Sequence, residues 1–168
     1  MNIKIDKREI ISLKGFELGW RFDKIHNSEI LETEKKEIFP LSKDESRRLN
    51  KVIDFFEIES NRLGKYMETD WFSANAENNE KIEKFKLKLE NYLKLFDEDL
   101  IISWERKVTL KTSKEIFLKY WTDFLYPSSD DVTIISENTN WILFYHHVEV
   151  ANLWIKNNFN ETKMEKTT

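Results

Sequence analysis

The stretch KYWTDFLYPSSDDVTIISENTNWILFYHH, residues 119–147, decides how this chain folds. Its first part is the end of an aromatic helix, which Pro127 stops because the residue before a proline is driven out of the α region. Ser128 to Asp131 are turn formers, whose side chains bond nearby backbone N–H groups. The apolar runs 131–136 and 141–147 then predict two strands joined by a turn at residues 137–140.

Three helices are predicted from apolar residues at helical spacing, over residues 40–60, 79–99 and 112–127. Ser42 with Glu45, and Thr112 with Glu115, have the spacing of capping boxes. The stripes on these helices place four aromatic residues in the core, which are Phe56, Phe85, Trp121 and Phe124.

Strands are predicted over residues 17–25 and 100–108, while residues 148–156 fit either a strand or a short helix. The resulting order is strand, helix, helix, strand, helix and hairpin. This order predicts an α+β fold with an antiparallel or mixed β-sheet and about three helices packed mainly on one side. Residues 1–156 are expected to form a single domain, and the polar residues 157–168 a flexible tail.

The composition narrows the class of protein. The 168 residues carry a net charge of −4 and include no cysteine. Disulfides, thiolate metal sites and cysteine nucleophiles are therefore excluded. We find neither the apolar segment of a signal peptide nor a membrane-spanning run, so we expect a cytoplasmic protein. Binding to nucleic acid is not expected, because neutralising phosphates requires clustered Lys and Arg.

Candidate chemistry is limited to one pairing, of Asp130 or Asp131 with His146 or His147. Neighbouring strand residues point to opposite faces, so His146 and His147 are not expected to face one metal ion. His26 lies on a distant segment, and the zinc-binding spacings of histidine are absent. We therefore expect no catalytic residues, no metal and no cofactor, and interpret the stretch as mainly architectural.

Short motifs along residues 18–147 resemble a family of small bacterial proteins of unknown function. The matching residues are Trp20 and Phe22; Pro40, Leu41 and Ser42; Asp70 and Trp71; Phe117, Trp121, Phe124 and Leu125; and Asp130 and Asp131. Residues 148–168 have no counterpart in the pattern. The family is similar in size and composition to immunity proteins of bacterial polymorphic toxin and contact-dependent growth inhibition systems, and it supplies no catalytic residues that transfer to this chain.

The resemblance implies a protein that binds a cognate toxin domain, which we expect to be a nuclease, and neutralises it by occluding its active site. A nuclease carries a basic cleft, which acidic side chains complement. The expected partner-binding residues are Glu29, Glu32, Glu34, Glu37, Asp70, Trp71, Asp97, Glu98, Asp99, Asp130 and Asp131, with Phe72 or Trp154 as further anchors if exposed. Two alternatives remain open: a small hydrolase that uses an Asp/His pair, and a housekeeping scaffold.

Overall fold

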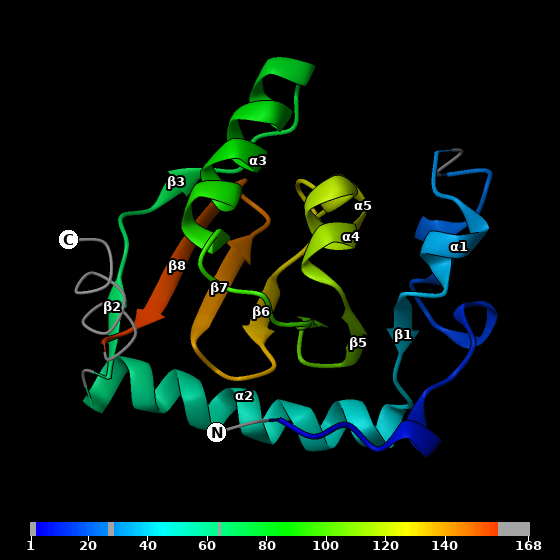
Figure 1. The fold of residues 1–168 in the computed structure, drawn as a ribbon, viewed down its shortest axis with the longest axis horizontal. Coiled ribbons are helices and arrows are strands. Elements are labelled where there is room, and N and C mark those ends of the chain that lie inside the picture. Colours follow the sequence, from blue (N-terminus) through cyan, green and yellow to red (C-terminus); the bar gives the residue numbers. More distant parts are fainter. Residues whose placement is uncertain (1–2, 27–28, 64, 158–168) are drawn as a thin grey trace.

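The computed structural model describes residues 3–26, 29–63 and 65–157, without the side chains of residues 56–63. An antiparallel sheet organises this part of the chain, in the order β1-β5-β4-β6-β7-β8-β2, with β3 also paired to β8 (Figure 1). The eight strands are β1 (Ile38–Pro40), β2 (Tyr66–Glu68), β3 (Phe72–Ser73), β4 (Leu100–Trp104), β5 (Val108–Thr112), β6 (Val132–Ser136), β7 (Trp141–His146) and β8 (Val150–Lys156).

Helices flank the sheet. The described residues contain five α-helices, which are α1 (Glu32–Lys35), α2 (Lys43–Leu63), α3 (Asn79–Leu93), α4 (Lys114–Lys119) and α5 (Trp121–Phe124). Three 3-10 turns precede them, namely η1 (Lys7–Glu9), η2 (Leu13–Gly15) and η3 (Gly19–Phe22). Within the described residues no helix combines the length and apolar character needed to cross a bilayer.

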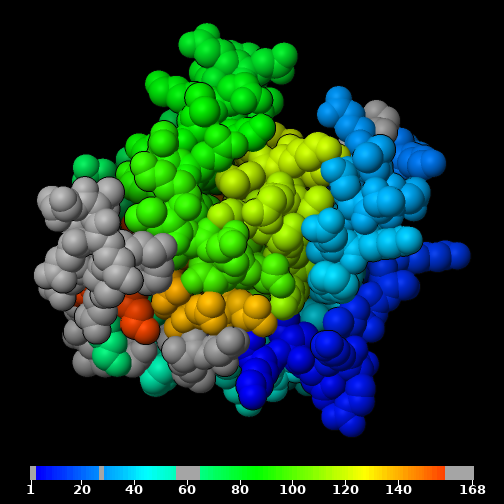
Figure 2. All heavy atoms as spheres, in the orientation of Figure 1, coloured from blue at the N-terminus to red at the C-terminus, as the bar shows by residue number. Residues whose placement is uncertain are grey.

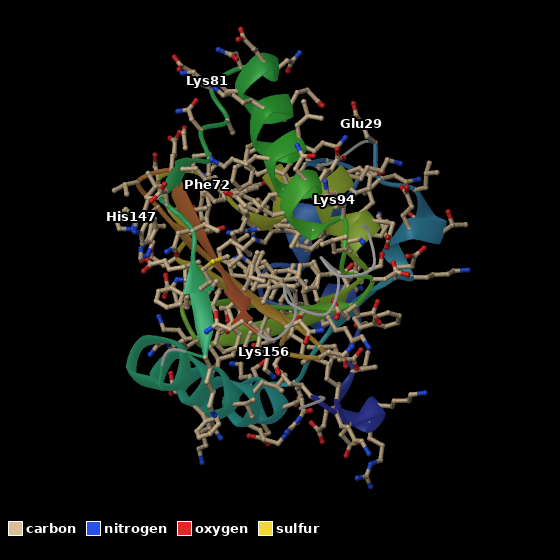
Figure 3. The ribbon with its side chains drawn as sticks, turned by 60° about the vertical axis from the view of Figure 1, so that its left-hand side comes forward. Glu29, Phe72, Lys81, Lys94, His147 and Lys156 are labelled. Atoms are coloured by element: carbon tan, nitrogen blue, oxygen red, sulfur yellow. The ribbon has the colours of Figure 1, made fainter. Side chains whose placement is uncertain are left out.

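Both faces of the sheet are covered, because its central strands are apolar on both sides. On β4, Leu100 and Ile102 belong to a core with α3, α4 and α5, whereas Ile101 belongs to a second core with α2. Figure 3 shows the sheet between α2 and α3. The α+β class is therefore confirmed, and the prediction of about three helices on one side is wrong. The long run of buried residues in β4 and β6 is typical of a sheet buried on both faces.

Residues 17–25 do not form the predicted strand. The 3-10 turn η3 occupies their centre, and it buries Arg21 and Phe22 while Trp20 stays 41% exposed. The alternating pattern placed Arg21 and Phe22 on opposite sides of a strand. In the structure Arg21 is buried as well, because it forms an ion pair with Asp130, which is far away in the sequence.

Residues 100–112 form a hairpin where a single strand was predicted. The backbone N–H of Lys107 donates to the carbonyl of Trp104 at 2.9 Å and closes the turn between β4 and β5. Thr112 ends β5, so the N-cap of α4 is Ser113, whose hydroxyl accepts from the N–H of Ile116. The predicted helix is also divided at Tyr120 into α4 and α5.

The helices predicted over residues 40–60 and 79–99 are confirmed as α2 and α3, although α3 already ends at Leu93 and one predicted cap differs. At the start of α2 the hydroxyl of Ser42 accepts from the N–H of Glu45 at 3.2 Å. The carboxylate of Glu45 binds the N–H of Asp6 and the guanidinium of Arg48 instead of closing the capping box. The hairpin β6–β7 is confirmed, and residues 150–156 form strand β8.

The predicted core is confirmed for Phe85, Trp121 and Phe124, each at most 1% exposed. Phe85 and Trp121 join α3 to α5, with ring centroids 4.5 Å apart. The prediction for the side chain of Phe56, and the one for the tail from residue 158 onward, lie outside the described residues.

Candidate functional site

On the face of the sheet that packs on α2, the side chains change from apolar at one end to mostly polar at the other. Side chains on this face form cross-strand rows, because residues paired in the register share a side of the sheet. From the covered end to the open end, the rows are Ile101, Ile135, Ile142 and Trp154; then Ser103, Thr133, Phe144 and Asn152; then Glu105, Asp131 and His146. The first row is apolar and packs on α2. In the two polar rows that follow, Phe144 still packs on this core, and the hydroxyl of Ser103 donates to Oδ1 of Asn50 in α2 at 3.1 Å.

A hollow of about 570 Å³ lies over the polar rows. We call it the sheet-face groove. Its described lining residues are Glu68, Trp71, Glu105, Arg106, Asp131, Val132, Thr133, Phe144, Tyr145, His146, Asn152 and Trp154. Strands β2, β6, β7 and β8 and the β4–β5 turn therefore build one surface from segments that are far apart in the sequence.

Asp131 stands at the rim of the groove, between two histidines. Its Oδ1 lies 2.9 Å from Nδ1 of His147 and 3.6 Å from Nδ1 of His146. The same oxygen accepts the backbone N–H of His147 at 3.1 Å. Both rings reach one carboxylate because β7 ends at His146 and His147 already belongs to the following turn, so strand alternation does not separate them.

The hydrogen bond from the ring of His147 lowers the pKa of Asp131 below its usual value, while partial burial acts in the opposite direction. This contact orients the imidazole of His147 and leaves its Nε2 directed elsewhere, which is an arrangement that general bases use. However, His147 is about half exposed and is not among the described residues that line the groove, whereas His146 is.

Asn152 and Glu68 form a polar contact between β8 and β2 in the groove. The Nδ2 of Asn152 donates to Oε1 of Glu68 at 2.6 Å. Asn152 is only 1% exposed, and its Oδ1 has no hydrogen-bond partner among the residues that the structure describes. Trp154 lies opposite Glu68 in the β2–β8 register, so the indole and the carboxylate are neighbours.

Trp71 forms the aromatic rim of the groove, at 51% exposure. Its ring centroid lies 5.2 Å from that of His146. Phe72, by contrast, is buried and packs on Phe85, so it is unavailable as a surface anchor.

Glu105 and Arg106 enter the groove from a turn with an uncommon backbone. Their φ angles are 45° and 59°, in the left-handed region that side chains other than glycine avoid. Asp54 pairs with Arg106 at 3.0 Å, and Lys107 pairs with Glu105 at 2.5 Å. The turn thus holds two charged side chains at a position where Asn and Gly are the ordinary residues.

Asp130 is a structural residue. Its carboxylate receives both Nη atoms of Arg21, at 2.5 and 2.9 Å, and the backbone N–H of Tyr126 at 2.9 Å. Its side chain is only 7% exposed. This carboxylate is therefore occupied inside the protein, and the expectation that Asp130 contacts a partner stays a prediction without support from its position.

The remaining predicted acids lie away from the groove. Figure 3 shows Glu29 and His147 on opposite sides of the molecule, and Figure 2 shows α1, in light blue, at the margin. On this side Glu34 binds Lys119 and Tyr120 at 2.6 Å each, contacts that lower its pKa to about 2. Glu32 pairs with Lys35, and Glu37 accepts from Ser113.

The acidic segment before β4 is also engaged within the fold. Asp99 pairs with Lys111 at 2.9 Å, Glu98 accepts from Asn140 at 2.5 Å, and Asp97 lies 3.7 Å from Lys114. The structure therefore places only Trp71 and Asp131 of the predicted set in the groove, with Asp70 exposed beside Trp71.

Sequence reasoning missed Glu68, Glu105, Arg106, Thr133, Phe144 and Asn152 as groove residues. A polar residue inside an otherwise apolar strand would have indicated part of this set. Thr133 in β6 and Asn152 in β8 are such residues. Glu68 and Arg106 carry no such signal, since their places depend on a short edge strand and on a hairpin turn.

No three His, Cys, Asp or Glu side chains of the described ranges are grouped as metal ligands. No protein-family model, no curated protein and no solved structure matches the chain. The resemblance to immunity proteins therefore stays a prediction, and the groove is the feature from which a function can be inferred.

Proposed function

We propose that this protein is a cytoplasmic immunity protein that binds a cognate bacterial toxin domain, which we take to be a nuclease, and neutralises it by occluding its active site. We further propose that the sheet-face groove is the surface that makes the contact. The observation that carries the proposal is the open end of the sheet, where the exposed ring of Trp71 and two partly buried aromatic rings lie beside carboxylates.

The groove has the composition of a protein-binding surface. Trp71 is half exposed, and Trp154 and Phe144 are partly buried against the core beneath α2, so each of the three rings leaves some apolar area open to a partner. Aromatic anchors of this kind dominate the binding energy of protein interfaces. Glu68 and Asp131 add negative charge at the same place, and a nuclease that binds phosphates presents cationic side chains at its active site.

Two measurements test the proposal. The first is a growth assay in which the proposed cognate toxin domain is co-expressed with the wild type, with the double variant Trp71→Ala/Trp154→Ala, or with Glu115→Gln as a surface control. We expect the wild type and E115Q to restore growth and the double variant to fail. The second is calorimetric titration of the same proteins with that toxin domain, in which the double variant should bind at least about 100-fold more weakly, as for the loss of two aromatic anchors.

Salt dependence separates the electrostatic part of the contact. Glu68→Lys should weaken binding, and the penalty should grow as salt is lowered, because screening shrinks at low ionic strength. If the wild type does not bind the toxin domain, or if reversing the groove charges leaves affinity unchanged at two salt concentrations, the proposal is rejected.

A second candidate function is supported by the contact between Asp131 and His147, which has the geometry of a carboxylate–imidazole pair in a hydrolase. His147→Gln distinguishes the two candidates. A hydrolase would lose its activity with stability unchanged, whereas an immunity protein would keep most of its neutralising activity, because His147 lies outside the lining of the groove.

A further inference from the structure

We propose that the sheet-face groove contains a subsite for one arginine side chain of the protein partner, formed by Asn152, Glu68 and the indole of Trp154. This inference rests on the proposed function, since it names the chemistry that the partner presents to the groove.

The amide of Asn152 has a fixed orientation. A carboxylate can only accept hydrogen bonds, so the side-chain atom of Asn152 that lies 2.6 Å from Oε1 of Glu68 must be the Nδ2 donor. This leaves Oδ1 as an acceptor. Oδ1 has no partner in a residue that is 1% exposed, and leaving a buried acceptor unsatisfied is costly.

Glu68 is the carboxylate of the groove that is left without a cationic partner in the described contacts. Among the four groove residues with permanent charges, Arg106 is paired with Asp54 and Glu105 with Lys107. Asp131 is engaged with the two histidines at the rim. Glu68 is bound only to an uncharged group in the described contacts, the amide of Asn152. The groove therefore offers a carboxylate next to a neutral acceptor, and a cation satisfies both.

The shape of the subsite favours a planar cation. Glu68 is paired with Trp154 in the register of β2 and β8, so a planar indole borders the two acceptors. A guanidinium presents several N–H donors in one plane and stacks on aromatic rings, whereas an ammonium is a compact point charge. The neighbouring acceptors and the indole together favour arginine over lysine.

The test uses small probes, so it does not depend on the toxin. The probe is Nα-acetyl-L-arginine methylamide, titrated into the ¹⁵N-labelled full chain. The readouts are the indole N–H signal of Trp154 and the side-chain amide signals of Asn152. Nα-acetyl-L-citrulline methylamide is the matched uncharged probe, and the corresponding acetyl-lysine compound tests the preference for a planar cation. We expect saturable shifts with arginine, and about tenfold weaker binding for citrulline, because a charge-assisted hydrogen bond is lost.

The decisive variant is Glu68→Gln, because this exposed residue can change without disturbing the core and glutamine still accepts from Asn152. It should weaken arginine binding about tenfold, as should Asn152→Leu, while Glu115→Gln leaves it unchanged. Equal binding of arginine and citrulline, or shifts that survive E68Q, would overturn the subsite. Equal binding of lysine would overturn the preference for arginine. Arginine binding without toxin binding would support the subsite and reject the proposed function. Toxin binding without arginine binding would support the proposed function and reject the subsite.

Discussion

Replacing Asp130 by Asn should destabilise the protein strongly, although it changes only one atom of the side chain. The carboxylate of Asp130 receives both Nη atoms of Arg21, and the two side chains are 7% and 5% exposed. The guanidinium lies 4.2 Å from the ring centroid of Tyr126, and its Nε has no hydrogen-bond partner. Removing the opposing charge would leave the buried cation with one neutral acceptor, three aromatic rings and the electrostatic influence of Asp123.

The expected magnitude follows from the burial of the pair. Removing one partner of a buried ion pair costs about 3–5 kcal/mol, because the other charge stays desolvated. The asparagine side chain of D130N would still accept one hydrogen bond from Arg21, so we expect about 3–4 kcal/mol for this variant and a similar loss for Arg21→Met. The double variant should be more stable than the sum of the single losses by about 2 kcal/mol, since it leaves no unpaired charge.

The assay is urea denaturation at pH 7, followed by circular dichroism because tryptophans lie near the site. The exposed pair of Arg47 with Asp44, at 3.0 Å, supplies the control, and Arg47→Met should change the unfolding free energy by less than about 0.5 kcal/mol. The loss for D130N should persist in 1 M salt, because buried charges are poorly screened. A loss below about 1 kcal/mol, or strict additivity of the two single variants, would refute the view that this ion pair anchors η3 to the loop before β6.

Three further outcomes are expected. Trp121→Ala should lower the unfolding free energy by about 3–5 kcal/mol, since Trp121 is 1% exposed, and a loss below about 1 kcal/mol in denaturation would contradict its place in the core. Burial raises the pKa of Asp123 from 3.8 to about 6, so its protonation stabilises the fold fully below pH 3.8 and this gain disappears as the pH rises through 6. Relative to Asp123→Asn, the wild type should therefore lose roughly 1–2 kcal/mol between pH 4 and pH 7, and parallel stability profiles would contradict this. Replacing Glu105 and Arg106 by Asn and Gly should raise the melting temperature, with a gain of about 1–2 kcal/mol from the relieved left-handed backbone; an unchanged or lower melting temperature would show that the turn is not strained.

The fold was predictable where local pattern and burial agree. The hairpin of β6 and β7 follows from two apolar runs around a polar turn, and the stripe of α3 from Phe85, Leu89 and Leu93. The coverage of both sheet faces was not predicted, because periodicity alone does not separate a strand buried on both sides from other buried segments. The strand expected at residues 17–25 failed for a different reason, since Arg21 is held inside by a partner 109 residues away.

The candidate site was predictable only in part. In the sequence Trp71 is recognisable as an aromatic residue next to an acid, and Asp131 as an acid in a predicted turn. Both residues line the groove. Acidic density was a poor guide, because carboxylates such as Glu34 and Asp99 bind lysines of the same chain. The place of Asn152 in the groove could not be predicted, because its pairing with Phe144 and its contact with Glu68 both depend on the strand register.

Hydrogen–deuterium exchange of the full chain, with and without the proposed toxin domain, tests whether the sheet-face groove is the surface that binds it. We expect slower exchange on binding at residues 66–73, 103–107, 144–149 and 150–154, which contribute to the groove or flank it. The exchange of α1 and of residues 97–99 should stay unchanged. Protection confined to α1 and to residues 97–99, or a mixture whose exchange equals that of the free protein, would contradict the claim that the sheet-face groove binds the toxin.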